Sequence, residues 1–264
     1  MERLDWVKPY YTRAGDYWGP AGIGERDTKR VETARRLHPG NGNRMLELGA
    51  GAGETALAMA NAGWDVVAVE FAPTRAAQAR ELAERAANLT VVEADFYIVD
   101  LNERFEIVCY WDGFGIGSDS DQRRLLKRIA SDWLKPNGCA IVEIFSPWQW
   151  ARVVGREQRL DRNHPSHRYR QRRTAEFDPV NSCFIDTWTP IDDTTGEPDE
   201  GMAITQVIRC YSPADFLLLL EGTGLKAEYA EIDGEPFELS SAGAASRHPI
   251  WQSWSYLVRL APEQ

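Results

Sequence analysis

The sequence has no apolar run long enough to cross a membrane. Even the FLLLL of residues 216–220 is far shorter than the ~20 apolar residues that a bilayer span needs. The first residues, MERLDWVKPYY, also lack the apolar centre of a secretion signal. We therefore expect a cytoplasmic protein that does not enter a membrane.

Cysteine is scarce, and no two cysteines form a CxxC pair, which argues against the common zinc and thiol-exchange motifs. Three of the four lie inside apolar runs typical of buried strands. We expect free thiols in a reducing compartment and no metal site. The cysteines are Cys109, Cys139, Cys183 and Cys210.

Positive charge is also in short supply. The 30 basic residues face 40 acidic ones, which leaves a formal net charge of −10. A nucleic-acid backbone is bound mainly by neutralising basic side chains, so we do not expect a nucleic-acid partner. Only five of the basic residues are lysines, and together with the many alanines this arginine bias is typical of a high-GC bacterial genome.

The order of apolar patterns predicts an α/β fold. With 264 residues, the chain is long enough for one large domain with additions at its edge. Strand and helix patterns alternate along its first half, which favours a parallel sheet with helices on both faces. The predicted strands are 44–49, 64–70, 89–95, 105–111 and 139–145, and the predicted helices are 25–38, 53–63, 73–87 and 119–134.

The alternation stops at about residue 146. Two β-rich runs, 182–190 and 202–211, are joined by a polar segment and predict an antiparallel hairpin added to the rim of the sheet. The core pattern then resumes with a helix that Ser212 caps, and with strands 225–232 and 253–260. We therefore divide the chain into a lid (1–24), a core (25–145 and 212–264) and an insertion (146–211).

A glycine loop, ELGAGAG, follows the first predicted strand at residues 47–53. A strand that ends in such a loop and opens a helix presents backbone amides to a ligand. The dinucleotide fingerprint GxGxxG would require a small residue at position 54, where this chain has Glu54. A carboxylate there would repel a pyrophosphate, which counts against NAD(P) or FAD.

ELGAGAG resembles the ExGxGxG motif of class I S-adenosylmethionine-dependent methyltransferases, and the resemblance continues downstream. It implies that Glu70 binds the ribose hydroxyls and that Asp95 accepts from the adenine amino group, with Phe71 and Phe96 against the ring. One departure is Ala72, where the family commonly has Ser or Thr before the proline. The implied cofactor residues are Glu47, Gly49, Gly51, Gly53, Glu70, Phe71, Asp95, Phe96, Trp111 and Tyr11.

The family resemblance covers residues 25–145 most clearly and 203–260 more loosely. It implies a Rossmann-like fold with seven strands in the order 3214576, the last strand antiparallel. It also implies S-adenosyl-L-methionine as cofactor, with S-adenosyl-L-homocysteine as product.

The methyl acceptor has to be bound by parts that vary around the core. The N-terminal stretch WVKPYYTRAGDYWG is rich in aromatic residues and glycine, and either packs on the core or forms a hinged lid. An aromatic-walled pocket would favour an amine as the acceptor, because the faces of aromatic rings attract a developing cation. YYTRAGDYWG and YWDGFGIGSD resemble small-molecule N-methyltransferases of antibiotic, lincosamide-type, biosynthesis. We therefore predict catalytic roles for Tyr10, Tyr11, Tyr17 and Phe114.

Eight arginines lie between residues 152 and 173, beside His164 and His167. They either form a solvated or subunit-facing segment, as in a homo-oligomer, or clamp an anionic group of the acceptor. Either histidine is a candidate base that could take a proton from the acceptor, and we include His167 among the predicted catalytic residues.

The leading hypothesis is N-methylation of a small molecule. The nearest alternative, an O-methyltransferase, would depend more on a base such as a histidine or Asp112. An NAD-dependent oxidoreductase and a non-catalytic protein that binds S-adenosylmethionine are further alternatives.

Overall fold

The computed structural model describes residues 6–38, 40–161, 167–239 and 248–263. The strands of the larger sheet are β1 (Arg44–Leu48), β2 (Asp65–Glu70), β3 (Leu89–Glu93), β4 (Phe105–Phe114), β5 (Leu134–Phe145), β10 (Leu225–Ile232), β11 (Glu235–Pro236) and β12 (Ser255–Pro262). They are hydrogen-bonded in the order β11-β10-β12-β5-β4-β1-β2-β3. β1 to β5 pair in parallel, while β12 runs antiparallel to both of its neighbours.

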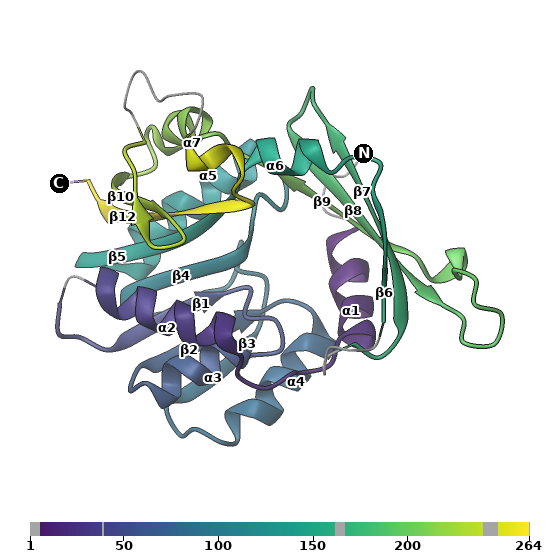
Figure 1. Cartoon of the computed structure of the whole chain (residues 1–264). Coiled ribbons are helices and arrows are strands. Elements are labelled where there is room, and N and C mark those ends of the chain that lie inside the picture. Colours follow the sequence, from purple (N-terminus) through teal and green to yellow (C-terminus); the bar gives the residue numbers. More distant parts are fainter. Residues whose placement is uncertain (1–5, 39, 162–166, 240–247, 264) are drawn as a thin grey trace.

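Helices cover both faces of this sheet (Figure 1). The α-helices of the described part are α1 (Val7–Tyr17), α2 (Glu25–Leu37), α3 (Glu54–Asn61), α4 (Pro73–Ala83), α5 (Asp119–Arg128), α6 (Pro147–Arg152) and α7 (Pro213–Leu220). Successive strand residues point to opposite faces. Met45 therefore packs in one buried cluster with Met59 of α3, and Leu46 in another with Leu125 of α5. This confirms the predicted α/β class.

The strand count differs from the prediction of seven by the two-residue strand β11, which pairs with β10 at the edge of the sheet. Without β11, the order of the other seven strands is the predicted one. Ser118 and Ser212 cap α5 and α7, and each side chain accepts from the backbone N–H three residues later. No helix in the described ranges is both long and apolar enough to span a bilayer.

The insertion forms a second sheet rather than a hairpin on the rim of the first. Its strands are β6 (Glu157–Leu160), β7 (Arg170–Asp178), β8 (Cys183–Ile191) and β9 (Ile204–Arg209), in that order and antiparallel. The predicted pair corresponds to β8 and β9. The sequence did not indicate β7, because arginine and glutamine take positions where a half-buried strand usually has apolar residues.

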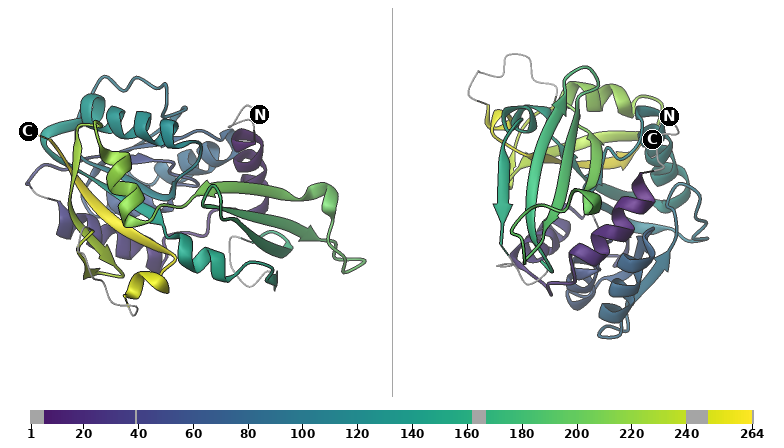
Figure 2. Two further views of the ribbon diagram at one scale, coloured as in Figure 1. Left: turned by 90° about the horizontal axis from the view of Figure 1, so that it is seen from above. Right: turned by 90° about the vertical axis from the view of Figure 1, so that its right-hand side faces the viewer.

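Helix α1 lies between the second sheet and α4, as the views in Figure 2 show. Tyr10, Ala14 and Tyr17 form a buried cluster with Ile204 of β9. On the other side of the helix, Gln78 of α4 donates to the Gly15 carbonyl at 2.9 Å. The N-terminal stretch therefore joins the two sheets, and it brings its aromatic residues to the carboxyl end of the parallel strands.

Candidate active site

The glycine loop between β1 and α3 has the backbone conformation that favours glycine. Gly49, Gly51 and Gly53 have φ angles of +64°, +59° and +90°. Gly49 and Gly51 line a cavity at the end of β1, but Gly53 does not. A Cβ at Gly53 would lie 2.9 Å from the Cβ of Ala79, so this glycine allows α3 to pack closely on α4.

Glu70, the last residue of β2, is held against the glycine loop. Its carboxylate accepts from the backbone N–H of Gly51 at 2.8 Å and of Ala72 at 2.7 Å. Burial raises the pKa of Glu70, and the two backbone N–H groups oppose that shift. Each oxygen keeps acceptor capacity, because a carboxylate oxygen can accept more than one hydrogen bond.

The cavity beside this loop has a volume of about 220 Å³. It brings together the ends of four neighbouring strands, where open α/β sheets bind their ligands. All of the predicted cofactor residues except Gly53 line it. They are Glu47, Gly49, Gly51, Glu70, Phe71, Asp95, Phe96, Trp111 and Tyr11.

Two buried polar atoms in the lining of this cavity lack a hydrogen-bond partner among the described residues. They are Oε2 of Glu47 and Nε1 of Trp111. Burial raises the pKa of Glu47 to about 8, which the charge of Arg30 partly opposes. Unpaired buried polar atoms are costly, so a carboxylate that faces a cavity here indicates a site for a cationic or hydrogen-bonding ligand group.

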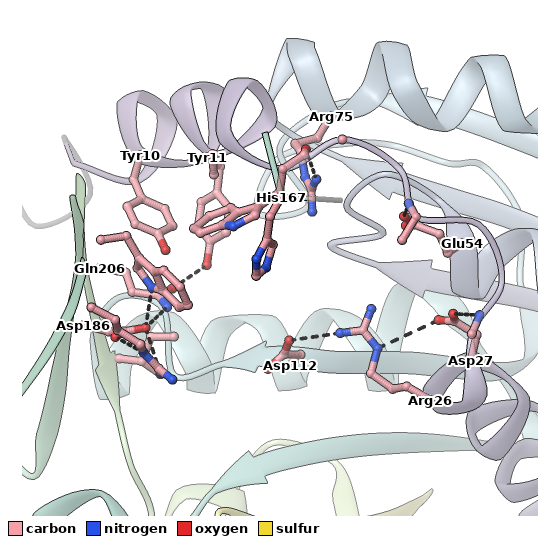
Figure 3. A pocket seen from close by; sticks show the side chains of 18 of the residues that line it. Tyr10, Tyr11, Arg26, Asp27, Glu54, Arg75, Asp112, His167, Asp186 and Gln206 are labelled. Carbon is pink, nitrogen blue, oxygen red and sulfur yellow. Dashed lines mark hydrogen bonds and ion pairs between the residues drawn. The ribbon is translucent and has the colours of Figure 1, made fainter. Parts of the chain in front are cut away.

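A larger cavity of about 610 Å³ adjoins the first. Figure 3 shows it between Tyr10 and Tyr11 of α1, the second sheet with Asp186 and Gln206, and the start of α2 with Arg26. Burial raises the pKa of both tyrosines, so their hydroxyl groups stay neutral. The lining residues common to both cavities are Tyr11, Arg26, Glu54, Arg75 and Asp112.

Two of the predicted catalytic residues lie away from both cavities. Tyr17 is 1% exposed, and its hydroxyl donates to the carbonyl of Met202, so it joins α1 to the second sheet. Phe114 is 0% exposed and packs against Tyr211 and Phe216 in the core. His167 lines the larger cavity, whereas His164 lies outside the described residues.

Asp112 is the carboxylate at the point where the cavities meet. It has a φ of +53°, a left-handed conformation that Asp tolerates better than most residues. Its side chain is 56% exposed and borders both cavities. Loss of solvating water around the carboxylate raises the pKa of Asp112, and the nearby charge of Glu143 raises it further. The charges of Arg30, Arg26 and Arg173 lower it.

One buried network in the larger cavity was missed by the sequence analysis. Asp186 is 1% exposed and pairs with Arg173 through contacts of 2.7 and 3.1 Å. It also accepts from Trp188 at 2.8 Å and from Gln206 at 3.2 Å, and Gln206 in turn accepts from Tyr11 at 3.3 Å. The network connects β7, β8 and β9 to α1.

The arginines of β7 are paired within the second sheet. Arg170 lies 3.1 Å from Asp193, and Arg172 lies 2.9 Å from Glu200. Arg173, which faces the larger cavity, is paired with Asp186. The carboxylates come from β8 and the segment after it, so the three arginines of β7 form ion pairs in the fold.

A family model described as a methyltransferase domain matches residues 45–138. The chain contains a methyltransferase domain. This confirms the prediction made from the glycine loop. A cypemycin N-terminal methyltransferase from a Streptomyces species is 29% identical over 119 residues, which cover 44% of this chain and about half, 48%, of that relative.

Solved methyltransferases share the whole fold. The CcbJ methyltransferase from Streptomyces caelestis superposes with a TM-score of 0.72 at 18% identity, over 100% of this chain and 99% of its own. The glycopeptide N-methyltransferase MtfA, complexed with sinefungin, superposes with a TM-score of 0.60 at 20% identity, over 93% and 89%. MtfA has also been solved with S-adenosyl-L-methionine.

The methyltransferase domain contributes very differently to the two cavities. It supplies every lining residue of the smaller cavity except Val7, Tyr11, Arg26 and Arg30. Of the larger cavity it supplies only Glu54, Arg75 and Asp112. The rest of that wall comes from α1, the segment 18–24, the start of α2, the end of β5, α6, His167 and the second sheet.

Proposed function

We propose that the protein transfers the methyl group of S-adenosylmethionine to a nitrogen atom of a small molecule in bacterial antibiotic biosynthesis. The observation that carries this proposal is the meeting of two cavities at Tyr11 and Asp112. The smaller cavity has the polar groups that suit the cofactor, and the larger one is open to a second ligand.

The smaller cavity fits the cofactor residue by residue. Glu70 would accept from the ribose hydroxyls, and Asp95 would accept from the adenine, with Phe96 beside the ring. The unpaired carboxyl oxygen of Glu47 can accept a hydrogen bond from the ammonium of the methionine part. When bound, S-adenosylmethionine supplies an electrophilic methyl group, and the protein's task is to align the acceptor with it and exclude water.

The choice of nitrogen and of an antibiotic pathway rests on likeness and on the character of the larger cavity. A relative and a structural neighbour act, by their names, as an N-terminal methyltransferase and a glycopeptide N-methyltransferase. The larger cavity also has aromatic walls, which suit a cationic acceptor better than a neutral hydroxyl.

Calorimetry tests the cofactor assignment. We expect S-adenosylhomocysteine to bind and NADH not to bind; the reverse result would contradict the proposal. For the acceptor, the enzyme and S-adenosylmethionine are incubated with candidate amines and alcohols, and intact masses are measured. A gain of one methyl group on amines supports N-methylation, whereas methylation confined to hydroxyl groups would identify an O-methyltransferase.

A further inference from the structure

The larger cavity is lined by more acidic than basic side chains. The acids are Glu25, Asp27, Glu54, Asp112 and Asp186, and the bases of Lys and Arg type are Arg26, Arg75 and Arg173. A cleft lined by an excess of one charge attracts ligands of the other, and low-dielectric walls strengthen that field. The lining therefore favours a cationic ligand.

Four of these five carboxylates are already held by other groups. Asp186 pairs with Arg173, and Asp27 accepts from Thr55 at 2.6 Å. Glu54 and Glu25 are held by the Ala21 N–H at 2.9 Å and the Lys29 ammonium at 2.7 Å.

Asp112 differs from these carboxylates. Its oxygens accept no hydrogen bond from the residues that the structure describes, and its ion pair with Arg26 is 3.9 Å long. This carboxylate, at the junction with the smaller cavity, is therefore the one with most capacity for a ligand.

Aromatic walls of the same cavity suit a cation. Trp150 stacks on Phe184 with ring centroids 4.0 Å apart, and the guanidinium of Arg173 lies 5.5 Å from the Trp150 ring and 4.8 Å from the Trp188 ring. The same surface thus already holds one cation within the protein. Nε1 of Trp150 is buried without a hydrogen-bond partner among the described residues, so it can donate to an oxygen of a ligand.

We propose that Asp112 recognises the acceptor as an ammonium ion and holds its nitrogen at the junction of the two cavities. This inference rests on the proposed function. An ammonium has no free electron pair, so one proton must first pass to the carboxylate. The freed pair then forms the bond to the methyl carbon as the carbon–sulfur bond breaks, and sulfur leaves as a neutral thioether. The product is again an ammonium.

The test uses 2-phenylethylamine and its neutral counterpart 2-phenylethanol, titrated into the enzyme saturated with S-adenosylhomocysteine at pH 7.5. We expect the amine to bind at least tenfold more tightly than the alcohol. Asp112→Asn should reduce that preference to within twofold when the variant is likewise saturated with S-adenosylhomocysteine. Asn tolerates the left-handed backbone at this position, so the variant should fold.

Two further variants make the test specific. Glu25→Gln removes a carboxylate of the same lining that is 82% exposed and paired with Lys29, and it should keep the amine preference. Asp112→Glu should restore part of the preference. Equal binding of the two probes, no binding of either, or a preference that survives Asp112→Asn overturns the inference. Failure of S-adenosylhomocysteine to bind would instead overturn the proposed function.

Discussion

Replacing Glu70 with glutamine should weaken S-adenosylhomocysteine binding about 30- to 100-fold. Glutamine keeps the shape of the side chain but has one acceptor oxygen, while two backbone N–H groups already bind the Glu70 carboxylate at 2.7 and 2.8 Å. Hydrogen bonds to a charged acceptor contribute about 1.5–3 kcal/mol each. Losing one hydrogen bond to the ribose, and weakening the other, costs about 2–3 kcal/mol of binding free energy. A change of about 1.4 kcal/mol corresponds to a factor of ten in affinity.

The assay is calorimetric titration of S-adenosylhomocysteine at pH 7.5 against a matched control, Glu93→Gln. Glu93 lies directly beside Glu70 in the register of β2 and β3, but it is paired with Arg80 at 2.9 Å and is 36% exposed. The control should bind as wild type does. If the affinity of Glu70→Gln also stays within twofold of wild type, Glu70 is not the residue that binds the ribose hydroxyls.

Three further predictions concern stability and the second sheet. Gly53→Ala should lower the free energy of unfolding by about 2 kcal/mol or more, while Gly63→Ala, with a similar φ of +97° and open space around its Cβ, should cost only about 1 kcal/mol in thermal melts. In wild type, unfolding free energy should fall as pH rises from 4.5 to about 8, because folded Glu47 keeps a proton that the unfolded chain releases. Glu47→Gln should lack this slope and be up to about 4 kcal/mol more stable above pH 8 in urea titrations; a parallel pH profile would contradict the shift. Asp186→Asn removes the charged partner of the half-buried Arg173, and we expect the free energy of unfolding to fall by about 3 kcal/mol; an unchanged melting temperature would contradict this.

The core and the cofactor cavity were predictable because local patterns determine them. Apolar residues at strand and helix spacing place Glu70 and Asp95 at the ends of neighbouring parallel strands, which always meet at one edge of the sheet. Gly53 was the exception: the motif implies contact with the cofactor, but its missing Cβ makes room for Ala79 instead.

The larger cavity depended on pairings that the sequence does not reveal. Asp186 lies next to Ala175 only once β7 and β8 are in register, and that pairing brings its carboxylate to Arg173. The catalytic role predicted for Phe114 came from the stretch YWDGFGIGSD, which does not reveal which face of β4 a residue occupies. In the fold, Phe114 packs in the same buried cluster as Val108 and Tyr110.

The wall shared by the two cavities makes each ligand part of the other's surroundings. A molecule bound in the smaller cavity covers one side of Asp112 and Tyr11, and so completes the surface that a second molecule meets. If the first ligand raises the affinity for the second by some factor, the second raises the affinity for the first by the same factor, because linkage between two binding sites is reciprocal. If the proposed function is right, the binding of the two substrates is therefore coupled, and residues of this wall affect the binding of both.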